Sequence, residues 1–189
     1  MPQTEYEYNL VQLKTLIDAY TIADLKSMIY GIPVSPSGAC CYPAIQTLVS
    51  LMELLGKICT NEQGKDAFKN IIFRLGERYQ KEELVNDLYE HFRHGIAHSS
   101  LAKGKVLIKK DGDTNYHLCN NVIDVKIIFE DFLPIYESLF SQYLLDSKKG
   151  SFYEENLRTI FRGLNYPWIT DFRTTLIEEK KRRAWNNTK

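Results

Sequence analysis

The sequence lacks the motifs that mark the most common enzyme classes. Its 189 residues contain no Gly-x-Gly-x-x-Gly loop, no Gly-x-x-x-x-Gly-Lys phosphate loop, no Gly-x-Ser-x-Gly turn and no His-Glu-x-x-His pair. These patterns place backbone N–H groups against phosphates, expose a serine nucleophile or hold zinc on one helix face. Their absence excludes the usual dinucleotide-binding, NTP-hydrolysing, serine-hydrolase and metalloprotease functions.

An excess of charge of either sign is also missing. Lys and Arg total 24 and Asp and Glu total 24, so the formal net charge is zero. A protein that holds nucleic acid mainly through bulk charge is more basic, so any phosphate contact must be local. No apolar run approaches the roughly 18 residues of a membrane span, and the first ten residues carry no Lys or Arg. We therefore expect a soluble, cytoplasmic protein that does not contact a membrane.

Cysteine is scarce and shows no metal-binding spacing. Cys40, Cys41, Cys59 and Cys119 form no Cys-x-x-Cys pair, and the adjacent Cys40 and Cys41 do not suit a zinc finger. The four residues are expected to be free, mostly buried thiols in a reducing compartment. The sequence predicts no metal and no other cofactor.

The residues that are abundant favour helices. Hydrophobic residues make up 44% of the chain and recur every three or four positions, which is typical of amphipathic helices. This spacing covers residues 6–29, 42–59, 68–79, 81–98 and 124–145, the last containing Pro134 as a predicted kink. Over 42–59 the polar residues form a single narrow stripe of Gln46, Ser50, Glu53 and Lys57. That helix should therefore be the central, buried one.

Only one segment alternates as a strand does. Two short runs, 105–109 and 116–119, flank Asp111-Gly112, and Asp-Gly between such runs favours a hairpin turn. The sequence thus predicts an all-α fold, a helical bundle of five or more helices over residues 1–146 with a small β-hairpin at about 105–119. Residues 151–189, with helices expected at 152–161 and 171–185, would form a C-terminal extension docked on the same domain.

Three of the four histidines and an arginine lie within residues 91–98. At 100° per residue, His91, His94 and His98 fall within about 60° of one another on a helix. Arg93 lies about 140° from His98 in an ideal α-helix, so the two side chains would not converge on one atom. Either Gly95 distorts the last turn, or the second group comes from another subunit.

The run Arg93-His94-Gly-Ile-Ala-His98 resembles the signature of the HEPN (higher eukaryotes and prokaryotes nucleotide-binding) domains. Their motif is an Arg, often followed by a polar residue, with a His four to six positions after the Arg, on a late helix of an all-α bundle. The resemblance implies a homodimer whose two motif helices form one composite site that cleaves RNA without metal. Other such domains are inactive partners or nucleotide-binding modules, and defence or toxin–antitoxin systems would add a cognate protein partner.

RNA cleavage suits these side chains, because the 2′-hydroxyl of RNA is the nucleophile and the site only moves protons and stabilises charge. His98 is the candidate acid or base, Arg93 the phosphate clamp, and His94 an orienting or second proton-transfer residue. Several alternatives stay open. The cluster is also typical of a solvated helix end, or of a metal site formed by His91, His94 and His98. His117 is interpreted as a surface histidine, and the whole chain as either an endoribonuclease or a non-catalytic dimerisation, nucleotide-binding or protein-interaction module.

Overall fold

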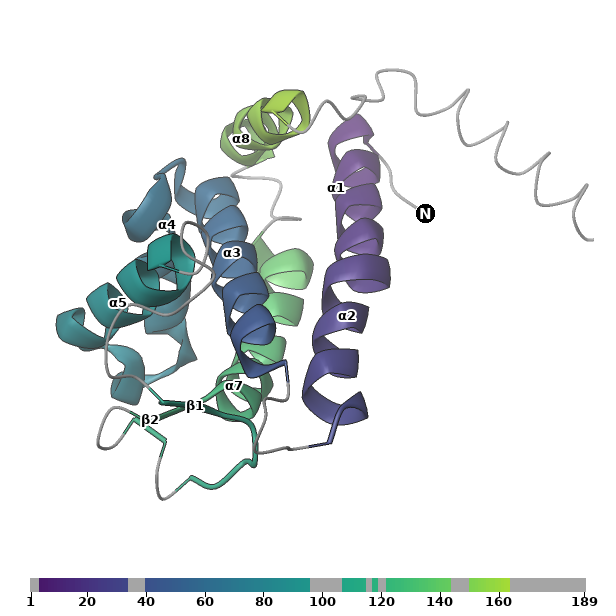
Figure 1. Ribbon diagram of the computed structural model, residues 1–189. Coiled ribbons are helices and arrows are strands. Elements are labelled where there is room, and N and C mark those ends of the chain that lie inside the picture. The colour runs from purple at the N-terminus through teal and green to yellow at the C-terminus, as the bar shows by residue number, and fades with distance from the viewer. Residues whose placement is uncertain are drawn as a thin grey trace, which may run out of the picture.

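A computed structural model describes residues 4–33, 40–95, 107–114, 117–118, 122–143 and 150–163. These residues form a helical bundle with one small two-stranded sheet, so the predicted all-α class with a small β insertion is confirmed. The helix α3 stands in the middle of the bundle and the other helices surround it (Figure 1). Among the described residues, every helix is too short or too polar to span a lipid bilayer.

The N-terminal helical rod is continuous. It comprises α1 (Glu5–Leu16), the π-helical turn η1 (Ile17–Ile22), α2 (Ala23–Lys26) and a second π-helical turn, η2 (Ser27–Gly31). Thr4 starts it with a capping box: its hydroxyl accepts from the Glu7 N–H, and the Glu7 carboxylate accepts from the Thr4 N–H. Leu10 and Leu25 lie on the buried face of the rod, as the helical spacing predicts.

The central helix α3 (Cys41–Thr60) begins and ends at residues in the left-handed region, Cys40 at φ 58° and Asn61 at φ 62°. Its buried positions include Ile45, Leu48 and Leu55, each at most 1% exposed. The sequence prediction of a central, buried helix over 42–59 is therefore confirmed. Burying an apolar helix on most of its circumference removes a large nonpolar area from water, which is the main force that holds this bundle together.

The next helices pack against one side of α3. They are α4 (Gly64–Ile72), the 3-10 turns η3 (Phe73–Leu75) and η4 (Glu77–Tyr79), α5 (Glu82–Leu88) and the π-helical turn η5 (Tyr89–Gly95). The backbones of α3 and α4 approach closely at Gly56, where an added Cβ would lie 1.9 Å from the Ala67 carbonyl oxygen. This close contact fixes the orientation of α3 relative to α4, and so sets where the rest of the α3 surface lies.

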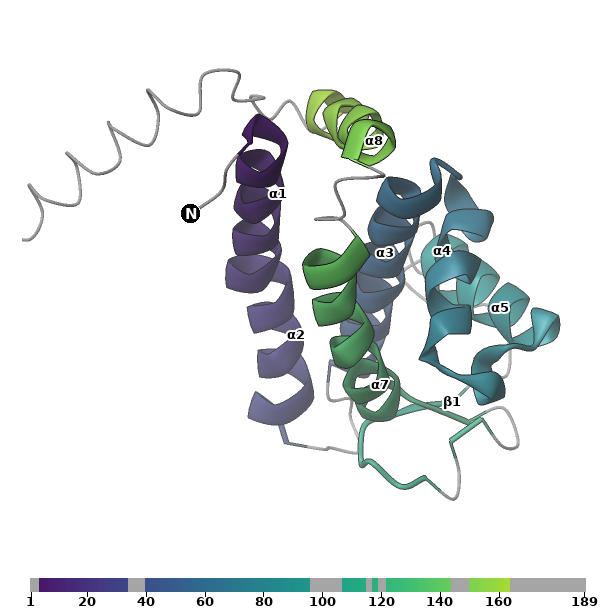
Figure 2. The ribbon, with the colours of Figure 1, turned by 180° about the vertical axis from the view of Figure 1, so that it is seen from behind.

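Behind α3 runs α7 (Val125–Ser138), which continues into the π-helical turn η6 (Leu139–Tyr143). Figure 2 shows α7 between α3 and the N-terminal rod. Asp124 caps α7, because its carboxylate accepts from the N–H groups of Lys126 and Ile127. Pro134 lies inside α7 and does not end the helix.

The small sheet corrects the predicted hairpin. Strand β1 (Leu107–Lys109) pairs with β2 (Val122–Asp124), and the pair is parallel, with Leu107 opposite Val122. The sequence placed the second strand at residues 116–119 and in antiparallel pairing. Gly112 does turn, at φ 79°, but its N–H donates to the Asp124 carboxylate, 2.8 Å away. The chain therefore continues beyond the turn at Gly112, and the residues that pair with β1 are those directly before α7.

Two contacts join the outer elements to the core. Lys110, 4% exposed, donates to the carbonyls of Met28 and Ile32 at the C-terminal end of the N-terminal rod. The helix α8 (Gly150–Gly163) packs across α3 and α1, and its Asn156 donates to the Ile58 carbonyl at 2.9 Å. The first helix predicted after residue 150 thus contributes buried side chains to the core. The helix predicted at 171–185 lies outside the described residues.

Candidate functional site

The side chain of Arg93 is placed by the central helix. Arg93 lies in η5, and its Nε donates to Glu53 Oε2 on α3 at 2.8 Å. The hydroxyl of Tyr89, one turn earlier in η5, donates to the same oxygen at 3.2 Å. The Arg93 side chain is 38% exposed and Glu53 is 23% exposed. One half-buried carboxylate therefore orients the guanidinium, while part of the Arg93 side chain stays at the surface.

Electrostatic interactions keep the Arg93 guanidinium charged. The hydrogen bond to Glu53 raises the pKa of Arg93, and burial beside the Glu53 carboxylate raises the pKa of Tyr89 to about 12. The guanidinium is thus a permanent cation and the phenol a permanent donor near neutral pH. Within the described residues, Glu53 is the acceptor that Arg93 uses, and it takes the Nε–H group. The two terminal nitrogens form the planar pair that suits two oxygens of a phosphate.

The remaining predicted motif residues are described in part or lie outside the description. His91 and His94 lie in the helical turn η5, but the structure describes only their backbone and neither side chain. His98 lies outside the described residues. Of the predicted set, only Arg93 therefore has a placed side chain. In the part of the chain that is described, no three His, Cys, Asp or Glu residues come together as metal ligands.

Glu53 and Tyr89 are the residues that the sequence prediction of the site missed. The signal for Glu53 was present, because it belongs to the polar stripe of an otherwise apolar helix. A carboxylate at the edge of a buried helix needs a partner, and the arginine of η5 supplies it. Tyr89 has no comparable signal, since an aromatic residue in an amphipathic helix is most often a core residue, and here it is 5% exposed.

His117 corrects another prediction, because it is buried and not a surface histidine. It is 6% exposed and is hydrogen-bonded through both ring nitrogens. Its Nδ1 accepts from the Asp124 N–H at 3.1 Å, and its Nε2 lies 3.1 Å from the Tyr79 hydroxyl. Since Nδ1 accepts, the proton of the neutral ring is on Nε2 and is donated to Tyr79.

The hydrogen bonds of His117 continue through Tyr79 to more exposed charged side chains. The Tyr79 hydroxyl donates to the Asp131 carboxylate on α7, which also accepts from Arg78. Burial, together with the smaller effect of the Arg78 cation, lowers the pKa of His117 to about 4. Burial and the bond to Asp131 raise the pKa of Tyr79. His117 is therefore a neutral connector between the β insertion, η4 and α7, which gives it a structural role.

No family model, curated protein or solved structure matches the chain. Its function must therefore be argued from its own residues.

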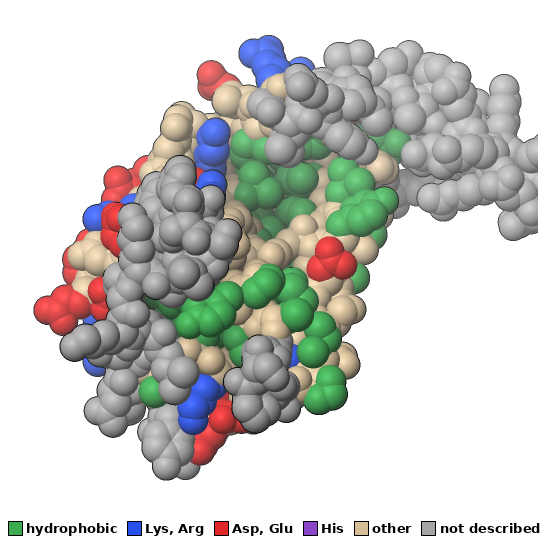
Figure 3. Space-filling view, in the orientation of Figure 1, with side chains coloured by type: hydrophobic (Ala, Val, Ile, Leu, Met, Phe, Trp, Pro, Cys, Tyr) green, Lys and Arg blue, Asp and Glu red, His purple; other side chains and the backbone are tan. Residues whose placement is uncertain are grey.

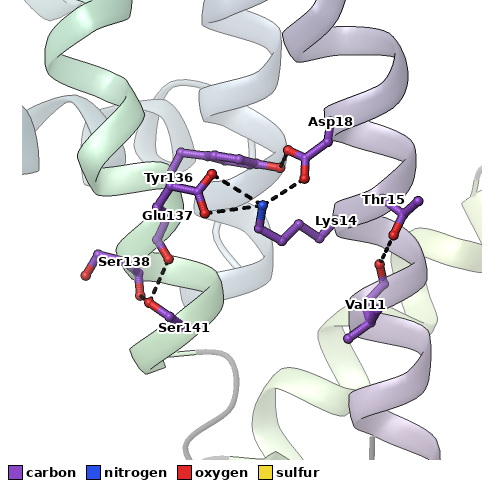
Figure 4. A network of polar contacts seen from close by, with 8 residues as sticks. All are labelled: Val11, Lys14, Thr15, Asp18, Tyr136, Glu137, Ser138 and Ser141. Carbon is purple, nitrogen blue, oxygen red and sulfur yellow. Dashed lines mark hydrogen bonds and ion pairs between the residues drawn. The ribbon is translucent and has the colours of Figure 1, made fainter. Parts of the chain in front are cut away.

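A polar network joins the N-terminal rod, through α1 and η1, to α7 (Figure 4). Lys14 bonds Asp18 at 2.8 Å and Glu137 at 3.3 Å, and the Tyr136 hydroxyl donates to Asp18 at 2.7 Å. Each charged group in it faces an opposite charge or a hydrogen-bond donor. The network lies beside an apolar pocket of about 210 Å³ that Leu10 and Phe140 help to line.

The described cysteines form no disulfide, as predicted, but they are less buried than the sequence suggests. Cys40, Cys41 and Cys59 are half-buried, and burial raises the pKa of Cys59 to about 11. A thiol with a raised pKa is a poor nucleophile at neutral pH, which disfavours cysteine-based catalysis at Cys59. Cys119 lies outside the described residues.

Proposed function

We propose that this protein is a HEPN-like, metal-independent endoribonuclease that acts as a homodimer. The observation that carries the proposal is the Arg93 side chain, which remains 38% exposed while its Nε is bonded to Glu53, a carboxylate that also accepts from Tyr89. A pre-oriented cation at the surface is what a phosphate clamp requires, because no reorganisation is then needed when charge develops on the phosphate. The all-α bundle is compatible with the HEPN resemblance.

The proposed reaction uses the nucleophile of the substrate. A histidine takes the proton of the ribose 2′-hydroxyl, whose oxygen attacks the adjacent phosphorus. Arg93 stabilises the added negative charge on the pentacoordinate phosphate. A second histidine donates a proton to the departing 5′-oxygen, leaving a 2′,3′-cyclic phosphate. His98 and His94 are the proposed proton-transfer residues, and Glu53 is a positioning residue that acts through Arg93.

The test is cleavage of single-stranded RNA by the pure protein in EDTA. We expect wild type to cleave, and Arg93→Ala and His98→Ala each to lower the rate about a hundredfold or more. Arg162→Ala is the matched control, because Arg162 is an exposed arginine on α8 and its loss should leave the rate unchanged. Glu53→Gln should lower the rate less than Arg93→Ala, since the amide still accepts from Arg93 but carries no charge.

Three results would contradict the proposal. Equal rates in wild type and both alanine variants would remove Arg93 and His98 from the mechanism. Loss of cleavage in EDTA would favour a metal site at His91, His94 and His98. A pure wild-type protein that cleaves no RNA would favour the alternative, a non-catalytic dimerisation, nucleotide-binding or protein-interaction module.

A further inference from the structure

A groove on α3, the helix whose Glu53 holds Arg93, has the chemistry of a base-binding site. It has a volume of about 370 Å³ and lies between α3 and η1, lined by Thr21, Gln46, Thr47, Ser50, Leu51 and Leu54. None of these side chains is charged. Figure 3 shows this face of the molecule, where the hollowed centre carries mainly hydrophobic and uncharged side chains.

Two polar side chains of the groove have the chemistry to bind a ligand. Within the described residues, the Gln46 amide and the Ser50 hydroxyl make no hydrogen bond, and both residues are half-buried. An amide and a hydroxyl each donate and accept, so together they match the mixed donor and acceptor edge of a nucleobase. Leu51 and Leu54 add an apolar wall for the ring. A charged phosphate would find no cation among these six residues.

The groove and the site at Arg93 share the helix α3. At 100° per residue, Tyr42, Gln46, Ser50 and Glu53 lie within about 80° of one another along α3. Ser50 is one turn before Glu53, which holds Arg93. At the other end, Tyr42 is 42% exposed and packs on Phe92, the residue before Arg93, with ring centroids 6.4 Å apart. An exposed aromatic ring, neutral hydrogen-bonding groups and the carboxylate that holds Arg93 thus follow one face of α3.

We propose that this groove holds an unpaired base of the RNA whose phosphate contacts Arg93, and that it sets the base preference of the nuclease. The inference rests on the proposed function. Gln46 and Ser50 bond the edge of the base, and Tyr42 stacks on a neighbouring base, a combination typical of single-strand recognition. A volume near the lower end of small-ligand pockets admits one base and excludes a duplex.

The experiment measures binding and cleavage of four fluorescent homopolymeric RNA octamers, of A, C, G or U. We expect wild type to prefer one base, and Gln46→Ala or Ser50→Ala to weaken binding of that octamer about tenfold and to reduce the preference. Thr159→Ala is the matched control, because this exposed hydroxyl bonds only the Glu155 carbonyl of its own helix. Circular dichroism and thermal melting establish that each variant is folded.

The outcomes separate the two proposals. If wild type cleaves RNA and the groove variants keep its affinity and base preference, the groove inference is wrong and the nuclease stands. If the groove variants lose the preference while Arg93→Ala loses cleavage, both are supported. If wild type neither binds nor cleaves any octamer, both are overturned.

Discussion

At the scale of single residues, burial decides which polar groups are structural and which are available. The Arg93 side chain is 38% exposed, whereas Lys110, at 4% exposure, places its ammonium on two backbone carbonyls. His117 is buried in the same way and is hydrogen-bonded at both nitrogens. Of these three side chains, only Arg93 is exposed enough to bind a ligand.

The buried His117 predicts a specific loss of stability in acid. Its folded pKa is about 4, below the value near 6.5 of an exposed histidine, so the unfolded chain binds the extra proton first. The contribution of neutral His117 is fully present above about pH 6.5 and is lost as the pH falls toward 4, by about 3 kcal/mol in all. The protonated ring would also face the Asp124 N–H with a second donor.

The measurement is urea unfolding of wild type and His117→Gln at several pH values between 7.5 and 4. Glutamine can still accept and donate but does not titrate in this range. The difference between the two proteins should shrink or reverse as the pH falls, while the carboxylates common to both cancel. Parallel stability curves over the whole range would show that His117 does not titrate as the structure indicates.

At the scale of elements, the contact between α3 and α4 sets the position of the site. The two backbones meet at Gly56, and Glu53 lies one turn before it on α3. A shift of α3 would therefore move the carboxylate that holds Arg93. Helix α8 adds a second constraint at the end of α3, because Leu157 is fully buried and Asn156 bonds the Ile58 carbonyl.

Gly56→Ala is expected to lower the free energy of unfolding by at least about 1–3 kcal/mol. The added Cβ would overlap the Ala67 carbonyl and force α3 and α4 apart. Gly31→Ala is the matched control, since nothing lies within 4 Å of the added Cβ and the change should be close to neutral. Thermal and urea melting measure both. Equal stability of the two variants would mean that α3 and α4 can separate at little cost.

At the scale of the whole molecule, the proposed active site requires two chains. In a composite dimer, an Arg93→Ala chain paired with a His98→Ala chain forms one doubly altered site and one intact site. Mixing and refolding the two inactive variants should therefore restore about a quarter of the wild-type activity, because about half of the dimers are mixed and each holds one working site.

The mixing experiment is followed by cleavage rate and by the mass of the species in solution. Each variant mixed with itself is the control and should stay inactive. No recovery in a preparation that contains mixed dimers would place Arg93 and His98 of one chain in the same site. A monomeric protein that cleaves RNA would remove the dimer from the proposal.

The sequence by itself determined the all-α class and the central place of α3, because helical periodicity and an almost fully apolar helix depend only on which residues follow one another. It also indicated Arg93 through a local motif. Only the tertiary structure decided that β1 pairs in parallel with residues 122–124, that His117 is buried, and that Glu53 holds Arg93. Those facts join residues 7 to 40 positions apart, and such contacts depend on how helices and strands pack, which local spacing does not encode.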